Sequence, residues 1–133
     1  MMHRKLSEIR ILLVDDTPVV LTMLSAMLSG IGFKKIATAT NVKAAQELFQ
    51  TLDECPFDVM FLDRYLGSQS GLAVLAYVKG RHPELPILML TQEAEGSKVI
   101  EAITLGASDY IVKPFTEDMI RSKLEKVLGQ NIA

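Results

Sequence analysis

Short runs of apolar residues recur along the chain, and several of them end on a polar residue. In Phe57–Asp63, four consecutive apolar residues, Val59 to Leu62, lead to a carboxylate. A continuous apolar run of this length is typical of a strand that is buried on both faces, as in a parallel sheet covered by helices. Ile11–Val14 and Ile87–Leu90 have the same pattern. These three segments therefore predict central strands.

Two segments of lower apolar content predict further strands, Lys34–Ala39 at an edge and Ser108–Val112 at the end of the chain. Between the strands, apolar residues recur at the spacing of amphipathic helices, and Thr17, Asn41 and Thr116 are predicted to cap three of these helices. The residues predicted to face the core from the helices are Val20, Leu24, Met27 or Leu28, Ile31, Ala44, Ala45, Leu48, Phe49, Leu52, Leu72, Leu75, Ala76, Val99, Ile100, Ile103, Ile120, Leu124, Val127 and Leu128.

Strands and helices alternate along the chain, and this alternation indicates the fold class. Five βα units predict a parallel sheet with right-handed crossovers and helices on both faces. We expect an α/β protein of the flavodoxin-like (βα)5 class, a three-layer sandwich whose five-stranded parallel sheet has the order 2-1-3-4-5. The strand order rests partly on a family resemblance. Arg64–Gly71, which follows the central strand, is predicted from its composition to be a loop.

Composition narrows the class of protein. A chain of 133 residues, 49% of them hydrophobic, is long enough for one domain with its own core. The net charge of −2 gives no electrostatic reason to expect nucleic acid as a direct partner. Cys55 is the only cysteine, which excludes an internal disulfide and a cysteine-rich zinc site. Because Met1–Arg10 has no apolar core of a secretory signal and no apolar run approaches ~20 residues, we expect a cytoplasmic protein without membrane insertion.

Polar side chains stand at four predicted strand ends: Asp15 and Asp16, Asp63, Thr91, and Lys113. Because parallel strands all end at the same edge of a sheet, we expect these side chains to converge, and that edge is where open α/β sheets bind ligands. Two like charges ~4 Å apart repel by about 4 kcal/mol at an effective dielectric constant near 20. Lys113 offsets part of this repulsion. The remaining repulsion between the carboxylates calls for a metal cation, and an oxygen-only ligand set favours Mg²⁺, or Mn²⁺ in its place.

Simpler interpretations exist for each residue of this set. A single Asp at a strand end is most often a helix cap or a solvated turn residue, a Thr is usually a cap, and a Lys-Pro pair usually lies in a loop. Polar groups at all four of these strand ends would occur together by chance much less often than any one of them alone. The chain has no G-x-G-x-x-G, no G-x-x-x-x-G-K-[ST] and no G-x-S-x-G motif, which argues against dinucleotide, P-loop and hydrolase sites. His3 and His82 are interpreted as tail and loop residues and not as ligands.

A family resemblance joins these motifs. Val14–Asp16, Leu62–Asp63, Leu90–Thr91 and Gly106–Phe115 resemble the receiver domain of two-component response regulators, and the likeness extends over about Ile9–Leu128. The last part of the chain looks most similar to the single-domain chemotaxis branch of that family. The resemblance implies a receiver domain over residues 9–129, with tails at 1–8 and 130–133.

The resemblance also implies roles for the residues at the strand ends. Asp63 would accept a phosphoryl group from a histidine kinase or a phosphotransfer protein, which makes the chain a phosphoacceptor and not an enzyme in the usual sense. Asp16 and Asp63 would bind Mg²⁺ directly, together with the backbone carbonyl of Tyr65, and Asp15 would act through water.

Further roles concern the signal after phosphorylation. By the same resemblance, Lys113 would pair with the phosphoryl oxygens, the Thr91 hydroxyl would move to hydrogen-bond them, and Tyr110 would swing inward when Thr91 moves. A downstream protein would bind the face formed by the helix that ends at Leu105, the last strand and the final helix.

Three positions depart from the family pattern. Gly67 stands where the family usually has Pro, Gln92 follows Thr91 where a small residue is common, and Tyr65 is large for its position. Together with Glu93, Tyr65 and Gln92 are predicted to tune the rates of phosphorylation and of phosphate loss.

Three functional hypotheses remain open. The chain is a stand-alone receiver, a receiver cut from a longer regulator with a DNA-binding or enzymatic output domain, or an interaction module that works without phosphorylation. The complete Asp/Asp/Thr/Lys set argues against the third hypothesis.

Overall fold

The computed structural model describes residues 3–50, 53–92 and 95–132. Within them, the main sheet has five parallel strands: β1 (Arg10–Val14), β2 (Lys35–Ala39), β3 (Val59–Asp63), β6 (Ile87–Thr91) and β7 (Asp109–Val112). Their spatial order is β2-β1-β3-β6-β7, which is 2-1-3-4-5 in chain order, as predicted. The predicted edge strand, β2, lies at one edge of the sheet.

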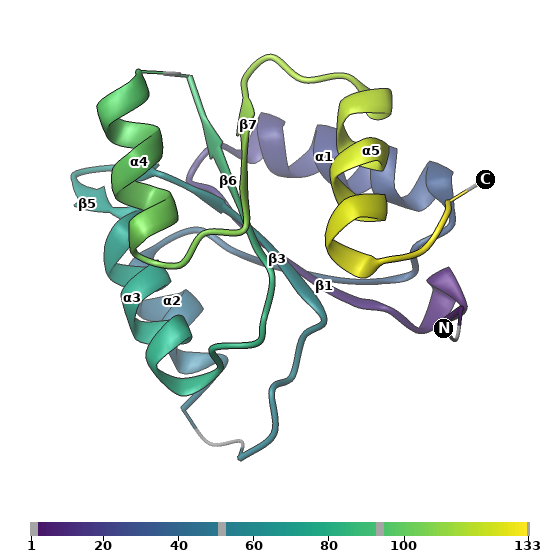
Figure 1. The fold of residues 1–133 in the computed structure, drawn as a ribbon, viewed down its shortest axis with the longest axis horizontal. Coiled ribbons are helices and arrows are strands. Elements are labelled where there is room, and N and C mark those ends of the chain that lie inside the picture. Colours follow the sequence, from purple (N-terminus) through teal and green to yellow (C-terminus); the bar gives the residue numbers. More distant parts are fainter. Residues whose placement is uncertain (1–2, 51–52, 93–94, 133) are drawn as a thin grey trace.

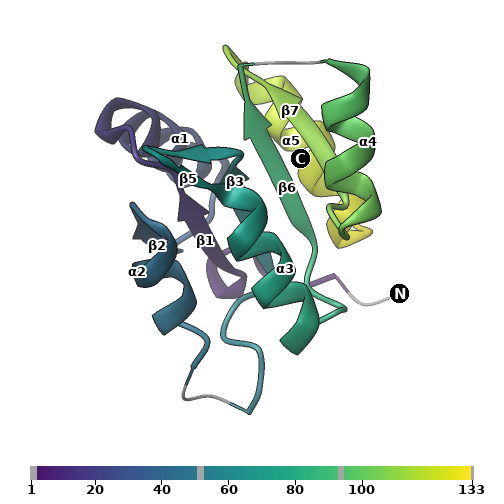
Figure 2. The ribbon, with the colours of Figure 1, turned by 90° about the vertical axis from the view of Figure 1, so that its left-hand side faces the viewer.

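Helices cover both faces of this sheet. They are the short 3-10 helix η1 (Leu6–Glu8) and the α-helices α1 (Pro18–Ile31), α2 (Val42–Glu47), α3 (Gly71–Arg81), α4 (Gly96–Thr104) and α5 (Glu117–Leu128). Helices α1 and α5 pack on one face, and α2, α3 and α4 pack on the other (Figures 1 and 2). The predicted flavodoxin-like three-layer architecture is therefore confirmed. No helix in the described ranges combines the length and the apolar character that a membrane crossing needs.

The sheet has a separate core on each face, which explains the continuous apolar runs. Along β3, Val59 and Phe61 pack with α1 and α5, whereas Met60 and Leu62 pack on the side of α2 and α3. Successive side chains of a strand point to opposite faces, so a strand that is covered twice has to be apolar at every position. All four of these side chains are fully buried.

The predicted helix starts are largely correct. Asn41 accepts a hydrogen bond from the backbone N–H of Ala44 at 2.8 Å, and Thr116 accepts one from Met119 at 3.2 Å, so both residues cap their helices as predicted. Helix α1 begins at Pro18, but the Thr17 side chain makes no capping hydrogen bond, so that part of the prediction is wrong. The Thr17 hydroxyl is instead 3.4 Å from a carboxylate oxygen of Asp16.

Some predicted inward faces of the helices are wrong. On α4, Ile100 is 67% exposed and Ile103 is 44% exposed, and the buried residue is Ala102. A small residue at the contact allows close packing of α4, and the larger side chains stay outside. On α3, Ala76 is exposed, whereas Val74 and Val78 are buried. These errors follow from short helices in which two apolar stripes fit the same spacing.

Helix α2 is shorter than its apolar pattern predicts. It ends at Glu47, so Leu48 lies beyond it and is 37% exposed, while Phe49 is fully buried from the following turn. Leu52 lies outside the described residues.

The segment after β3 is more ordered than the predicted loop. Strands β4 (Tyr65–Leu66) and β5 (Gln69–Ser70) form a small antiparallel hairpin. Gly67 lies in its turn with φ of +64°, a conformation that glycine adopts without the steric cost of a Cβ. Leu66 is buried, which fixes the hairpin to the core.

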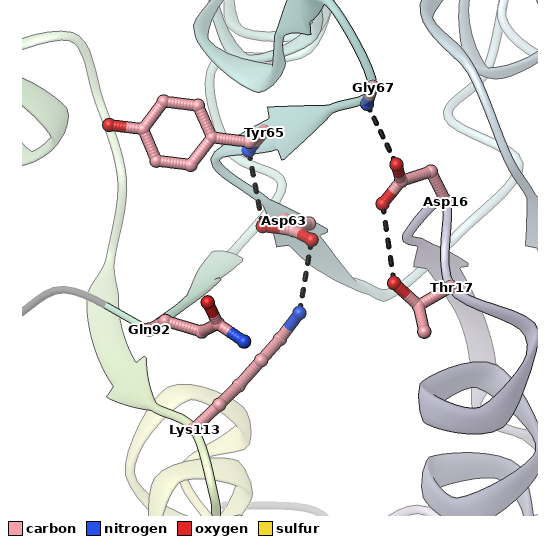
Figure 3. A pocket seen from close by; sticks show the side chains of 7 residues that line it. All are labelled: Asp16, Thr17, Asp63, Tyr65, Gly67, Gln92 and Lys113. Atoms are coloured by element: carbon pink, nitrogen blue, oxygen red, sulfur yellow. Dashed lines mark hydrogen bonds and ion pairs between the residues drawn. The ribbon is translucent and has the colours of Figure 1, made fainter.

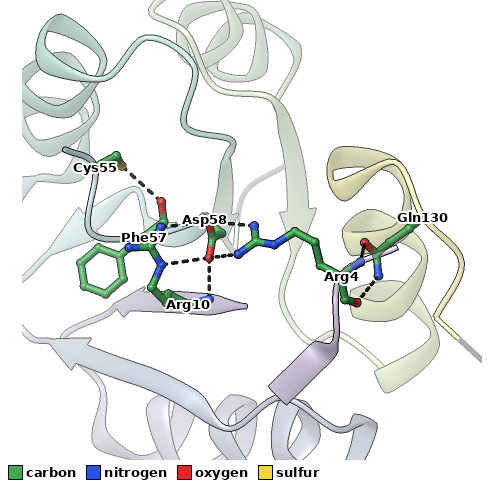
Figure 4. Close-up of polar contacts among 6 residues, drawn as sticks. All are labelled: Arg4, Arg10, Cys55, Phe57, Asp58 and Gln130. Carbon is green, nitrogen blue, oxygen red and sulfur yellow. Dashed lines mark hydrogen bonds and ion pairs between the residues drawn. The ribbon is translucent and has the colours of Figure 1, made fainter. Parts of the chain in front are cut away.

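The two ends of the chain contact the domain near the start of β3. The carboxylate of Asp58 accepts hydrogen bonds from the backbone and the guanidinium of Arg10 and pairs with Arg4 at 2.9 Å (Figure 4). The backbone N–H of Arg4 in turn donates to the Gln130 side chain at 3.0 Å. Ile132 is buried. Residues of both predicted tails therefore pack against the domain.

Candidate functional site

The carboxyl ends of the central strands meet at a cavity of about 200 Å³ (Figure 3). Asp15 directly follows β1, Asp63 is the last residue of β3, and Lys113 directly follows β7. The cavity is lined by Asp16, Thr17, Asp63, Tyr65, Gly67, Gln92 and Lys113. Side chains that are far apart in the sequence therefore converge, as the strand pattern requires.

Lys113 bridges two buried carboxylates. Its Nζ lies 2.7 Å from Oδ2 of Asp15 and 3.0 Å from Oδ2 of Asp63. Asp15 is 1% exposed and Asp63 is 7% exposed, so water screens neither charge well. One cation is thus shared between two anions in a poorly solvated place.

The pKa values of the pair reflect this arrangement. Burial raises the pKa of Asp63, and the charge of Asp15 raises it further, against the opposing hydrogen bonds from the Tyr65 backbone N–H and from Lys113. For Lys113, burial works to lower the pKa, but the contacts with Asp15 and Asp63 prevail and raise it. Lys113 is therefore charged at neutral pH, and the anionic form of Asp63 is less stabilised than that of an exposed aspartate.

Asp16 completes a group of three carboxylates. Its Oδ2 accepts a hydrogen bond from the Gly67 backbone N–H at 2.8 Å, and its side chain is exposed at the cavity mouth. One oxygen from each of Asp15, Asp16 and Asp63 lies within 4.8 Å of the others. Three carboxylates with one lysine among them leave excess negative charge. This oxygen-only donor set fits a hard divalent cation such as Mg²⁺.

The remaining predicted residues take different positions. Thr91 is fully buried at the end of β6, and its carbonyl accepts a hydrogen bond from the Lys113 backbone N–H at 2.7 Å. Gln92 lines the cavity (Figure 3), as does Tyr65. Tyr110 is half-buried on β7, paired with Met89 in the sheet, and does not line the cavity. Glu93 lies outside the described residues.

A family model described as the response regulator receiver domain matches residues 11–125. The chain belongs to the response regulator receiver domains. This receiver domain is 34% identical over 125 residues to chemotaxis protein CheY1 of Helicobacter pylori, and the match covers 92% of the chain and 98% of CheY1.

Other relatives are longer. The receiver domain is 34% identical over 122 residues to the transcriptional regulatory protein ZraR of Escherichia coli, a match that covers 92% of the chain but only 27% of ZraR. The crystal structure of the receiver domain of NtrX from Brucella abortus superposes with a TM-score of 0.80 at 33% identity, covering 90% of this chain and 98% of that one. The family thus includes both single-domain proteins and receivers with output domains.

The receiver domain also contains a connection that the sequence pattern did not reveal. Arg64, directly after Asp63, is 5% exposed and donates hydrogen bonds to the carbonyl of Lys98 at 3.0 Å and to the carboxylate of Glu101. Lys98 Nζ in turn donates to the Tyr65 hydroxyl at 2.8 Å. Both residues after Asp63 are therefore tied to α4. An Arg in a polar segment normally predicts a solvated side chain, so only the tertiary structure identifies this link.

Proposed function

We propose that Asp63 accepts a phosphoryl group from a histidine kinase or a phosphotransfer protein. The observation that carries this proposal is the position of its carboxylate, which faces a cavity, ends the central strand and pairs with Lys113 at 3.0 Å. A carboxylate of raised pKa beside a lysine is, in its ionised form, a suitable nucleophile for an incoming phosphorus atom.

The neighbouring side chains supply positioning and charge, which is most of what phosphoryl transfer requires. As an oxygen of Asp63 bonds to phosphorus and the bond to the donor imidazole breaks, Lys113 neutralises charge on the equatorial oxygens. The Thr91 hydroxyl donates to one of these oxygens. Asp16, Asp63 and the Tyr65 carbonyl would hold Mg²⁺ or Mn²⁺, and Asp15 would assist through water. The cation would supply additional positive charge to the transferred group.

The chain acts on itself and not on a free substrate. It assists its own phosphorylation and dephosphorylation, so it is a signalling domain and not an enzyme that turns over. Tyr65 and Gln92 line the cavity beside Asp63 and tune both rates, and the same rate-tuning role is proposed for Glu93. A cytoplasmic location belongs to the same proposal.

The output of the domain is protein binding at the face formed by α4, β7 and α5. Ile100, Ile103 and Leu105 are all more than 40% exposed there, and apolar side chains in one region mark a surface for a protein partner. Movement of Thr91 toward the phosphoryl group, followed by Tyr110, alters this face. Neither nucleic acid nor a membrane is a direct partner in this proposal.

A second candidate function is that of a receiver within a longer regulator. The match to ZraR, in which the aligned region is 27% of the protein, supports it. The genomic reading frame that encodes the chain distinguishes the two candidate functions. A reading frame that continues into an output domain would support the second one.

Labelling with radioactive acetyl phosphate in the presence of Mg²⁺ tests the acceptor. We expect label on the wild-type protein, none on Asp63→Asn, and none when a chelator removes the cation. Asp53→Asn, which removes a carboxylate from the exposed turn before β3, serves as the matched control and should label normally. Label that persists on a folded Asp63→Asn protein would refute the assignment.

A further inference from the structure

Three side chains that can bind a metal come together at the amino ends of the strands, at the end of the sheet opposite to Asp63. Cys55 lies before β3, and His82 and Glu84 lie in the connection between α3 and β6. One ligand atom from each lies within 4.8 Å of the other two. Cys55 and Glu84 also line a cavity of about 300 Å³ together with Arg10 and Asp58. Figure 4 shows Cys55 next to Phe57, whose carbonyl accepts its hydrogen bond.

His82 is the least expected member of the group, because its position in a loop predicts an exposed ring. Its side chain is only 7% exposed, and Nδ1 is 3.9 Å from the Glu84 carboxylate, which is too long for a hydrogen bond. Nε2 is buried and has no hydrogen-bond partner among the described residues. A buried imidazole without hydrogen bonds is costly unless another interaction uses its lone pair. A metal ion is such a partner.

The charges of the three side chains suit a divalent ion. A Cys55 thiolate and the Glu84 carboxylate supply two negative charges, and a neutral His82 supplies a lone pair. Burial raises the pKa of the Cys55 thiol, whose Sγ now donates to the Phe57 carbonyl at 3.2 Å. Metal binding would replace that proton, as it does at thiolate sites generally. The bound ion and its ligands would then be close to neutral, which reduces the cost of partial burial.

We propose that Cys55, His82 and Glu84 bind a transition metal ion such as Zn²⁺, with water as the fourth ligand. In a tetrahedral site with bond lengths of about 2.0–2.3 Å, ligand atoms lie about 3.3–3.6 Å apart. The three ligand atoms lie within 4.8 Å of one another, so each pair has to approach by at most about 1.5 Å to reach these separations. The Glu84 side chain is 69% exposed and is free to rotate toward the other two ligands.

This site selects a different metal from the carboxylates around Asp63. A set of sulfur, nitrogen and oxygen ligands favours Zn²⁺ and Co²⁺, whereas the oxygen-only set around Asp63 favours Mg²⁺. The metal would join the segment that leads into β3 to the segment that leads into β6. It would thereby fix the starts of two of the strands, β3 and β6, whose carboxyl ends contribute to the phosphorylation site.

Titration with Co²⁺, followed by near-ultraviolet absorption, tests the site directly. Thiolate bound to Co²⁺ gives a charge-transfer band that carboxylates do not give, so the Asp63 region does not contribute. We expect a band that saturates at one equivalent and disappears in Cys55→Ser. Because Glu84 is exposed, Glu84→Gln should fold normally and weaken Co²⁺ binding at least tenfold. His82→Gln should weaken Co²⁺ binding by at least the same factor.

Two controls separate the outcomes. Asp16→Asn, which alters only the carboxylate site, should leave the band unchanged, and Cys55→Ser should still be labelled by acetyl phosphate. Zn²⁺ should raise the melting temperature of the wild type and not that of Glu84→Gln. A band that requires Cys55 but keeps its affinity in both Glu84→Gln and His82→Gln would mean that a single thiol binds the ion, and the proposed site would be refuted.

Discussion

Replacing Gly71 by Ala tests how the structure holds the acceptor strand in place. Gly71 is the first residue of α3, and its backbone N–H donates to the Arg64 carbonyl at 2.6 Å. A Cβ at this position would overlap the carbonyl oxygen of Asp63 and lie 3.0 Å from the Asp63 carbonyl carbon and 3.1 Å from that of Arg64. All three atoms belong to the backbone, so no side-chain rotation relieves the contact.

The magnitude follows from this geometry. Carbon atoms prefer separations of about 3.5–4.0 Å, so α3 and the end of β3 must separate by on the order of 1 Å. Overpacking of this kind typically costs about 1–3 kcal/mol. A displacement of about 1 Å at a reacting group lowers the rate by up to roughly 100-fold. We therefore expect Gly71→Ala to lose about 2 kcal/mol of stability and to be labelled by acetyl phosphate at least about tenfold more slowly.

Gly80→Ala is the matched control on the same helix. A Cβ there has no atom within 4 Å, and alanine stabilises a helix over glycine by about 0.8–1.0 kcal/mol. Urea unfolding measures the free energies of unfolding, and the initial rate of labelling at fixed Mg²⁺ measures the chemistry. Equal stability and equal labelling rates in the two variants would show that the close approach at Gly71 does not position Asp63.

Three further changes probe other parts of the structure. Lys113→Arg should keep labelling but lose the increase in partner binding on phosphorylation, because the planar guanidinium obstructs the approach of Thr91; a normal increase would contradict this. Tyr65→Asn should speed Mg²⁺-dependent loss of phosphate by at least roughly threefold, about 0.65 kcal/mol, because the ring borders the path of the attacking water; decay after removal of the donor measures it, and an unchanged rate would argue against shielding. Asp58→Asn should cost about 1 kcal/mol at pH 7, since its partners Arg4 and Arg10 are partly exposed. Because the pKa of Asp58 is lowered by hydrogen bonds from Arg10 and Arg4 that outweigh its burial, this contribution is complete above the unfolded pKa of about 3.9 and is lost as pH falls below it. Urea unfolding at pH 7 and pH 3 should therefore show a smaller difference from wild type at pH 3, and a constant difference would contradict the assignment.

The fold class and the location of the site were predictable because they depend on local patterns, whereas the strand order rested partly on the family resemblance. A strand buried on both faces has no polar position, so Val59–Leu62 identified the centre of the sheet, and the first polar residue after it had to emerge at an edge. Parallel connections then placed Asp15, Asp63 and Lys113 at the same edge. No knowledge of long-range contacts was needed for these steps.

The errors occur where tertiary contacts decide between local alternatives. The apolar stripe with Ile100 and Ile103 on α4 predicts a buried face, but the helix packs through Ala102. Composition predicts a loop after Asp63, but burial of Leu66 converts it into a hairpin. Buried Arg64 is paired with a residue 37 positions away, and nothing near it in the sequence specifies that partner.

Arg64 also bears on how a charge at Asp63 reaches the surface. Before phosphorylation, Lys113 divides its contacts between Asp15 and Asp63. In the proposed function, phosphorylation would replace the charge of about −1 on Asp63 by about −2 on the phosphoryl group, displaced outward from the strand. Lys113 would then have a stronger partner and would reduce its contact with Asp15 or with the carboxyl oxygen of Asp63. Because the next two residues, Arg64 and Tyr65, are hydrogen-bonded to α4, an adjustment of the chain at Asp63 acts directly on that helix. This path to the α4 surface does not include Thr91 or Tyr110, the residues of the proposed switch, so it would reach α4 independently of them.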